Sequence, residues 1–245
     1  MCFNISVHLM PAYLETRFHA TFKEPEKLKP IYHSSAFTTP YLPIIANTDP
    51  GHIQFFQWGL IPFWVKDEDK ANKIRFNTFN AKSETVFEKP SFKVAIKNKR
   101  CLVLVDGFYE WQEVKGKKYP YYIKMANSEA FALAGIWDIW ENKTTGDKKN
   151  TFSIITTRAN PLLEKIHNKK KRMPVILKPE DEQRWLSDEL DVDGINSLLV
   201  PYDEQELEAY TVSKLISTRG QNSNVPEVMK RFEYGELKLD QMHLF

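Results

Sequence analysis

The feature that most constrains the fold is a pair of long apolar segments joined by a short polar one. Residues 130–140 and 151–157 are rich in β-branched and aromatic side chains, and residues 143–150 between them are polar. This pattern is typical of a β-hairpin. Further runs with strand character occupy residues 53–58, 101–105, 121–125 and 174–177. The chain is therefore expected to fold around a mainly antiparallel sheet.

Helical patterns are fewer and shorter. Asn160 followed by Pro161 predicts a short helix with asparagine as its N-cap. Pro179 followed by three acidic residues predicts a second helix, because its dipole stabilises acids in the first turn; residues 193–199 predict a third. Strands and helices do not alternate strictly, so the expected fold class is α+β, a single domain over residues 1–245 with a barrel-like β core and peripheral helices.

Composition excludes several classes of protein. The chain is 42% hydrophobic and 13% aromatic, which is enough for a sizeable core and unlike a disordered chain. Two cysteines cannot make a disulfide framework, and the N-terminal residues lack the pattern of a secretory signal. The longest apolar run is far shorter than a membrane span of about 20 residues. We expect a cytoplasmic monomer that does not bind membranes.

Charge is segregated along the chain. Residues 180–208 hold eleven acidic residues against Arg184 alone, a net charge of −10, so the rest carries +12 against an overall charge of +2. A body with this much positive charge could present a cationic face to a polyanion. The scattered histidines and the lack of a Cys-x-x-Cys pair predict no metal site. No glycine-rich phosphate loop is present, so no cofactor is expected.

Cysteine at position 2 is the first candidate for chemistry. Removal of the initiator methionine would leave an α-amine and a thiol on adjacent carbons. An α-amine has a pKa of about 8, against about 10.4 for a lysine side chain, so a far larger fraction of the α-amine is neutral at pH 7. Such an aminothiol can attack an aldehyde twice, first through nitrogen to give a Schiff base and then through sulfur to close a thiazolidine. Cys2 could equally be an ordinary small residue near the terminus.

Two further side chains suit proton transfer. Glu110 stands among aromatic residues after an apolar strand, and burial there would raise its pKa. His167 precedes a basic run, and histidine titrates near neutral pH. Taken singly, each could also be an ordinary salt-bridge or surface residue. The segment 77–85 is polar and without hydrophobic period, which predicts a loop that leads to a helix.

Several blocks together resemble a known family. They are Cys2, WGLIP at 58–62 with Trp64, NAKSET at 80–85, RCLVLVDGFYEW at 100–111, AGIW at 134–137, TTRAN at 156–160, and His167 with RMPVIL at 172–177. In this order they resemble the SOS response-associated peptidase (SRAP) family, whose members crosslink to abasic sites in single-stranded DNA. The blocks span residues 2–177, and the acidic part, residues 178–245, is expected to pack on them.

The resemblance implies a role for each matching residue. Cys2 would be the nucleophile, Asn80 would position it, Glu110 would be the acid–base group, and His167 would assist proton transfer. The crosslink would shield the abasic sugar from strand cleavage, and no cofactor would be needed. Residues expected to contact DNA through stacking or charge are Trp58, Pro62, Trp64, Arg75, Lys82, Arg158 and Arg172.

The chain departs from the family pattern at three places. Asn4 replaces an arginine of the usual Cys-Gly-Arg opening, and Lys82 replaces the arginine of Asn-Ala-Arg, so a bidentate phosphate ligand becomes a point charge. Residues 168–171 stretch the usual spacing between His167 and the Arg-Met-Pro block. Two other functions stay open: an N-terminal-nucleophile cysteine peptidase, and a single-stranded DNA-binding module without catalysis. With Met1 alone before Cys2, no propeptide is expected.

Overall fold

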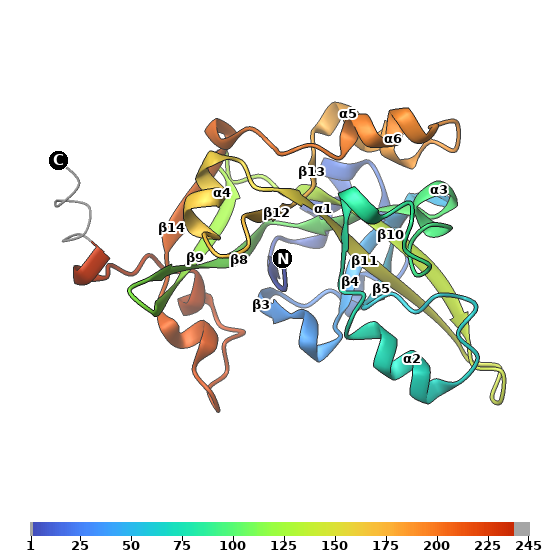
Figure 1. The fold of residues 1–245 in the computed structure, drawn as a ribbon, viewed down its shortest axis with the longest axis horizontal. Helices are drawn as coiled ribbons and strands as arrows, with labels where there is room; N and C mark the ends of the chain where they lie inside the picture. Colours follow the sequence, from blue (N-terminus) through green and yellow to red (C-terminus); the bar gives the residue numbers. More distant parts are fainter. Residues whose placement is uncertain (1, 238–245) are drawn as a thin grey trace.

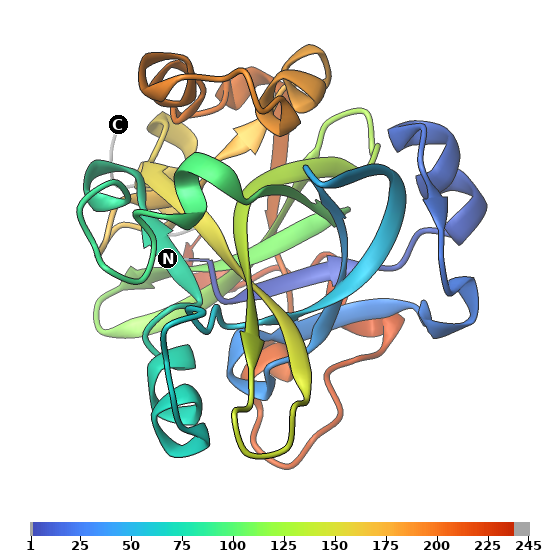
Figure 2. The ribbon, with the colours of Figure 1, turned by 90° about the vertical axis from the view of Figure 1, so that its right-hand side faces the viewer.

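Five strands of the computed structural model, which describes residues 2–237, close into a barrel. They are β4 (Tyr41–Ala46), β5 (Asp49–Trp58), β7 (Arg100–Val105), β10 (Phe131–Glu141) and β11 (Lys148–Arg158). Neighbours pair antiparallel in the order β11-β10-β7-β4-β5, and a parallel pairing of β5 with β11 at Gln57 and Thr151 closes the ring. The expected α+β fold with a mainly antiparallel barrel is thus confirmed (Figure 2).

A second antiparallel sheet carries the N-terminus. Its order is β14 (Leu207–Thr211), β9 (Lys117–Met125), β8 (Gly107–Val114), β1 (Asn4–Val7) and β3 (Ile31–Ser35). Only Asp106 separates β7 of the barrel from β8 of this sheet, so the two sheets are continuous through one chain segment. Consequently the N-terminus lies near the middle of the molecule, between the barrel and the second sheet (Figure 1).

Short strands complete the sheets: β2 (Thr21–Phe22), β6 (Asn80–Lys82), β12 (Arg172–Pro174) and β13 (Ile176–Leu177). The run predicted as one strand at 174–177 is therefore divided, because β12 pairs with β11 whereas β13 pairs with β10. The segment 77–85 is not simply a loop before an α-helix. Its middle forms β6, which is parallel to β11.

Helices lie on the outside of the sheets (Figure 1). They are α1 (Pro11–Phe18), α2 (Glu68–Arg75), α3 (Ala95–Asn98), α4 (Pro161–Ile166), α5 (Pro179–Leu186) and α6 (Val192–Leu198), with 3₁₀ turns η1 (Pro25–Lys27), η2 (Ala36–Thr38), η3 (Ser83–Thr85), η4 (Glu204–Glu206), η5 (Lys214–Ser217) and η6 (Pro226–Met229). Among residues 2–237 these helices are all too short or too polar to cross a membrane.

The predicted helix starts are confirmed for α4 and α5. The Asn160 side chain accepts a hydrogen bond from the Leu163 amide at 2.8 Å, and Pro161 and Pro179 each occupy the first turn of their helix. The third helix begins one residue before the predicted start, because the Asp191 side chain caps it by accepting from the Gly194 amide.

Arg100 joins the acidic segment to the barrel. It is fully buried, and its guanidinium donates to the backbone carbonyl oxygens of Trp185 at 2.8 Å and Ser187 at 2.5 Å on the α5 side. Two more carbonyls, those of Ile96 and Lys97, accept from its Nη1. A buried cation is tolerated only when its donors are satisfied. These four acceptors therefore tie both α5 and α3 to the first residue of β7.

Candidate functional site

Strand pairing brings Cys2 to the centre of the site. Strand β1 lies between β3 and β8, and Ile5 is opposite Phe108. Continuing this antiparallel register towards the N-terminus leads past Glu110 on β8. The Cys2 side chain is fully buried, and its backbone carbonyl accepts a hydrogen bond of 2.9 Å from the Asn80 side-chain amide. Asn80 is held in turn by the pairing of β6 with β11.

Glu110 and His167 lie together beside Cys2. The Nδ1 atom of His167 is 3.5 Å from Oε1 of Glu110, and the two side chains are 12% and 5% exposed. The same Nδ1 is 2.9 Å from the Arg172 carbonyl oxygen, which can only accept, so Nδ1 carries a hydrogen in this contact. Neutral His167 then has Nε2 as its proton acceptor. The structure thus brings together all four residues predicted to be catalytic.

Burial sets the protonation state of each group. It raises the pKa of Glu110 to about 7, so this carboxyl is divided between its acid and base forms at neutral pH. It lowers the pKa of His167 to about 4, which keeps the imidazole neutral. The pKa of the Cys2 thiol is raised far above its ordinary value, first by burial and then by the nearby Glu110 carboxylate. Cys2 is therefore a thiol and not a thiolate in this environment.

The extra residues after His167 are anchored on β8. Asn168 donates from its side chain to the Glu113 carbonyl at 2.8 Å and accepts from the Glu113 amide at 3.1 Å. His167 ends α4, and Lys171 then adopts a left-handed conformation with φ of 50°. The longer spacing therefore forms a compact turn, and the paired hydrogen bonds of Asn168 hold His167 at Glu110.

A cavity of about 450 Å³ lies beside Glu110 and His167. Glu110 and His167 line it together with Phe3 and Asn4 from the N-terminal segment. Three lysines also border it: Lys118, Lys169 and Lys170. Asn4, where the family has arginine, accepts a hydrogen bond of 2.9 Å through Oδ1 from His33 Nε2. The site can therefore receive a polar, anionic ligand beside two proton-transfer groups.

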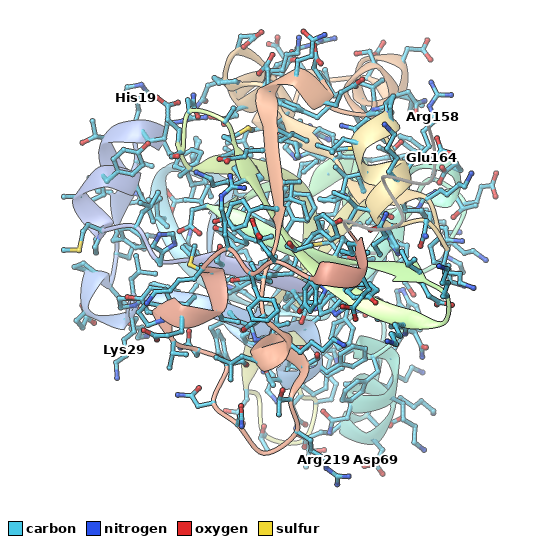
Figure 3. The ribbon with its side chains drawn as sticks, turned by 90° about the vertical axis from the view of Figure 1, so that its left-hand side faces the viewer. His19, Lys29, Asp69, Arg158, Glu164 and Arg219 are labelled. Carbon is cyan, nitrogen blue, oxygen red and sulfur yellow. The ribbon has the colours of Figure 1, made fainter. Side chains whose placement is uncertain are left out.

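Three of the residues expected to contact DNA are exposed. Trp64 is 45% exposed, and Lys82 follows Ala81 at the accessible end of β6. Arg158 ends β11, and its side chain points outward beside α4, near Glu164 (Figure 3). These placements leave each of the three side chains accessible to a nucleic acid, and the contacts themselves stay predictions.

Four others are placed differently from the sequence expectation. Trp58 is fully buried, stacks on Phe152 and donates to the Phe79 carbonyl at 2.9 Å, so its indole belongs to the barrel core. Pro62 is also buried. Arg75 is 7% exposed and donates to Gln57 at 2.7 Å. Because these side chains are buried in this structure, they are not exposed for direct stacking on bases or for phosphate binding.

Arg172 is engaged by the protein itself. Its guanidinium forms two hydrogen bonds with Glu84, at 2.8 and 2.9 Å, and a third with the Thr156 carbonyl oxygen at 2.6 Å. The pKa of Glu84 is lowered, chiefly by the hydrogen bond from Arg172. This carboxylate therefore already pairs with Arg172 in the structure, and a contact of Arg172 with phosphate stays a prediction.

Sequence reasoning missed two exposed phenyl rings near the site. Phe37 is 60% exposed and Phe76 is 52% exposed. Each is a large aromatic residue in a short, otherwise small or polar segment, SSAFTT and RFNT. A single aromatic residue within a polar segment has few apolar neighbours in sequence with which to form a core. This pattern could have predicted that the two rings are exposed.

Comparisons with known proteins identify a family and several relatives. Residues 1–219 match the family described as SOS response associated peptidase (SRAP). The chain is 42% identical over 204 residues to the abasic site processing protein YoqW of Bacillus subtilis, covering 81% of this chain and 87% of that protein. It is 30% identical to the abasic site processing protein HMCES of Pongo abelii, covering 85% and 67% respectively.

The fold also matches solved structures. The crystal structure of a protein from Bacteroides thetaiotaomicron superposes with a TM-score of 0.89 at 39% identity, covering 95% of this chain and all of that one (100%). A protein from Bordetella bronchiseptica gives a TM-score of 0.74 at 25% identity, covering 86% of this chain and 100% of that one.

Proposed function

Because this chain belongs to the SOS response associated peptidase family, we propose that it processes abasic sites in DNA by bonding covalently to them through Cys2. Relatives named abasic site processing proteins, at 42% and 30% identity, support this substrate class. The observation that carries the chemistry is the convergence of Cys2, Asn80, Glu110 and His167 at one place.

The reaction requires the free α-amine of Cys2, and therefore removal of Met1, a residue outside those the structure describes. The amine nitrogen attacks C1′ of the ring-opened sugar, and the adduct loses one water to give a Schiff base. The Sγ atom then adds to C1′ while its proton passes to the nitrogen, which closes a five-membered thiazolidine. Aldehyde and aminothiol thus yield the crosslink and one molecule of water.

The raised pKa of the Cys2 thiol supports this order of steps. A neutral buried thiol is a poor first nucleophile, because the thiolate is the reactive form. Nitrogen attacks first in this scheme, and the electrophilic Schiff base then receives the sulfur. The bound sugar brings amine, thiol and aldehyde within attack distance, which supplies much of the rate gain.

Glu110 is the group that exchanges protons in this scheme. Its pKa of about 7 lets it donate to the sugar oxygen during ring opening and to the departing water, and accept again afterwards. His167 is neutral and accepts through Nε2, with its other nitrogen held by the Arg172 carbonyl. Asn80 fixes the backbone of Cys2 and so the direction from which the amine attacks.

The crosslink has a protective consequence. A Schiff base at C1′ withdraws electrons and acidifies the C2′ proton, which promotes β-elimination and strand cleavage. Addition of sulfur returns C1′ to a tetrahedral carbon and removes that electron sink. The strand is therefore expected to stay intact while the thiazolidine persists.

The test is an SDS-stable adduct with single-stranded DNA that carries one abasic site. We expect an intact mass equal to protein without Met1 plus DNA minus one water. Without borohydride, neither Cys2→Ala nor Cys2→Ser should give an SDS-stable adduct. With borohydride, both should give a reduced imine, because both keep the α-amine and lack the thiol. Cys101→Ala is the matched control, because Cys101 is equally buried but lies on β7.

Three outcomes would contradict the proposal. An SDS-stable adduct that forms equally in Cys2→Ala without borohydride would place the bond elsewhere. Cleavage of a peptide panel in the absence of any DNA adduct would favour the peptidase alternative. Salt-dependent retention of undamaged DNA, again without adduct, would favour a binding module.

A further inference from the structure

We propose that Asp106 is a positioning residue for the nucleophile: its carboxylate fixes the register of β1 and thereby the place of the Cys2 aminothiol. This inference rests on the proposed function and names what holds the reacting residue in place. Asp106 has no part in the catalytic scheme. It is the single residue between β7 of the barrel and β8 of the second sheet.

The ladders on either side of β1 leave its register open. Within the described residues, β1 pairs with β8 at Ile5 and Ser6 alone. On the other side, Ile5 is opposite Ser34. Two residues later Val7 is opposite Ile31, so β3 has one residue more than β1 in this interval. Because an irregular ladder does not by itself exclude a slipped pairing, the short strand β1 needs a further contact that selects one register.

The Asp106 carboxylate makes that contact beside the irregular part of the ladder. Its Oδ1 atom accepts a hydrogen bond from the Ser6 hydroxyl. Its Oδ2 atom accepts from the backbone amides of His8 and Leu9, the latter at 3.2 Å. The Asp106 amide also donates to the Ser6 carbonyl oxygen at 3.1 Å. Asp106 is only 5% exposed, and a buried carboxylate is tolerated when donors such as these satisfy it.

A slip of β1 by one residue would break this contact and misplace the nucleophile. Ile5 or Val7 would then replace Ser6 at the carboxylate, and neither side chain has a donor. The same slip would move Cys2 by about 3.3 Å along the strand and turn its thiol to the other face. Since a buried acceptor without its donor is unfavourable, the hydrogen bonds of Asp106 also keep Cys2 in its observed place.

A tyrosine holds Ser6 from a second side. The Tyr122 hydroxyl oxygen lies 2.9 Å from Ser6 Oγ and 3.3 Å from the Asp106 carbonyl oxygen. Ser6 and Tyr122 are 0% and 1% exposed, so the three groups form a buried network. Gly107 permits this close approach, because a Cβ atom there would lie 2.2 Å from the Tyr122 hydroxyl oxygen. The Ser6 side chain is therefore fixed between Asp106 and Tyr122.

The first experiment measures in the absence of DNA whether Asp106 holds Cys2. The probe is iodoacetamide, and peptide mass spectrometry distinguishes alkylation of Cys2 from alkylation of Cys101. Both thiols are fully buried, and Cys101 lies on β7 as an internal reference. In the native chain we expect both to react slowly. Asp106→Ala should accelerate alkylation of Cys2 by roughly tenfold and leave Cys101 unchanged, because β1 alone loses these hydrogen bonds.

Two further variants control this experiment. Asp106→Asn keeps an oxygen for the backbone amides, and its NH₂ group can donate to Ser6 Oγ, so Cys2 should stay protected. Glu182→Gln is the matched control, because Glu182 is also 5% exposed but its carboxylate binds Arg17. It should leave both cysteines protected. Equal acceleration at Cys2 and Cys101 in Asp106→Ala, or no acceleration at Cys2, would overturn the inference.

The second experiment connects the contact to the reaction. At saturating abasic single-stranded DNA, adduct formation in Asp106→Ala should fall by about 10²-fold, the effect of a misplacement of about 1 Å. The dissociation constant for a strand with a tetrahydrofuran abasic analogue, which has no aldehyde, should stay near the native value. A loss confined to that affinity would contradict a positioning role.

The two experiments separate this inference from the proposed function. Alkylation is measured without DNA, so it reports on the hold of Asp106 on β1 whether or not the native chain forms an adduct. Selective exposure of Cys2 in Asp106→Ala, with no adduct in the native chain, would support the hold and reject the proposed function. An adduct in the native chain that forms at the same rate in Asp106→Ala would reject the positioning role alone.

Discussion

His167 Nδ1 lies 3.5 Å from Glu110 Oε1, which brings the C-cap residue of α4 against a residue of β8. Burial drives their pKa values in opposite directions, to about 7 for the carboxyl and about 4 for the imidazole. At neutral pH the pair therefore contains one group that can give a proton and one that can receive it. In the proposed function, this division of roles serves both the formation and the reversal of the bond to the aldehyde.

Replacement of Glu110 by Gln should remove the proton donor and keep the shape of the site. We expect the rate of adduct formation to fall by roughly 10²- to 10⁴-fold, the usual contribution of general acid–base catalysis. In the native chain the Glu110-dependent part of the rate should decline above pH 7, where the acid form is lost. Single-turnover rates from pH 5.5 to 9 measure both effects. A rate in Glu110→Gln that matches the native one at all pH values would contradict the role of Glu110.

The same pKa shifts predict how stability depends on pH. The folded pKa of Glu110 is raised from 4.5 to about 7, so its contribution to stability is present below pH 4.5 and is lost as pH rises through 7. The folded pKa of His167 is lowered from 6.5 to about 4, so its contribution is present above pH 6.5 and is lost as pH falls through 4.

Urea unfolding at several pH values tests this linkage. Between pH 5 and 8, Glu110→Gln should lose less stability than the native chain. His167→Gln should lose less than the native chain between pH 6.5 and 4. Parallel curves for the native chain and both variants would show that these groups do not titrate differently on folding.

Local patterns predicted a large part of this fold. The hairpin of β10 and β11 follows from two apolar runs and a polar turn, and the Asn160 cap follows from the residues beside it. The parallel pairing of β5 with β11 could not be predicted in this way, because it joins strands that are far apart in sequence. That pairing closes the barrel.

The candidate site shows the same division. Cys2, Asn80, Glu110 and His167 were identified through chemistry and family blocks, which name residue types. Whether the Trp58 side chain is exposed, and whether Arg172 is paired, depends on residues that are distant in sequence. Barrel closure buries Trp58, and Glu84 binds Arg172. Such pairings are properties of the tertiary structure, and a linear motif does not contain them.

Asn80 offers a test of positioning as distinct from binding. Asn80→Ala removes the hydrogen bond to the Cys2 carbonyl, and Asn80→Asp places a group without an N–H donor against that oxygen. Both variants should slow adduct formation at saturating DNA, the aspartate more than the alanine. The dissociation constant for a strand with a tetrahydrofuran analogue should change by less than about threefold, which corresponds to a binding free energy of about half a kcal/mol. A loss confined to affinity would argue that Asn80 binds DNA and does not orient Cys2.

The turn after His167 provides the last prediction. Asn168→Ala removes both hydrogen bonds to the Glu113 backbone, at 2.8 and 3.1 Å, and leaves that amide and carbonyl without these partners. We expect a loss of about 1 to 3 kcal/mol in the free energy of unfolding. Because His167 is anchored through this turn, adduct formation should slow as well, even at temperatures where the variant is fully folded.

Lys170→Ala is the control within the same turn, since it leaves the Asn168 contacts in place but removes one positive charge from the cavity. It should weaken DNA binding more at low salt than at high salt, and should not reduce stability. If Asn168→Ala and Lys170→Ala lose rate and stability alike, the turn acts through its charge and not by holding His167 against Glu110.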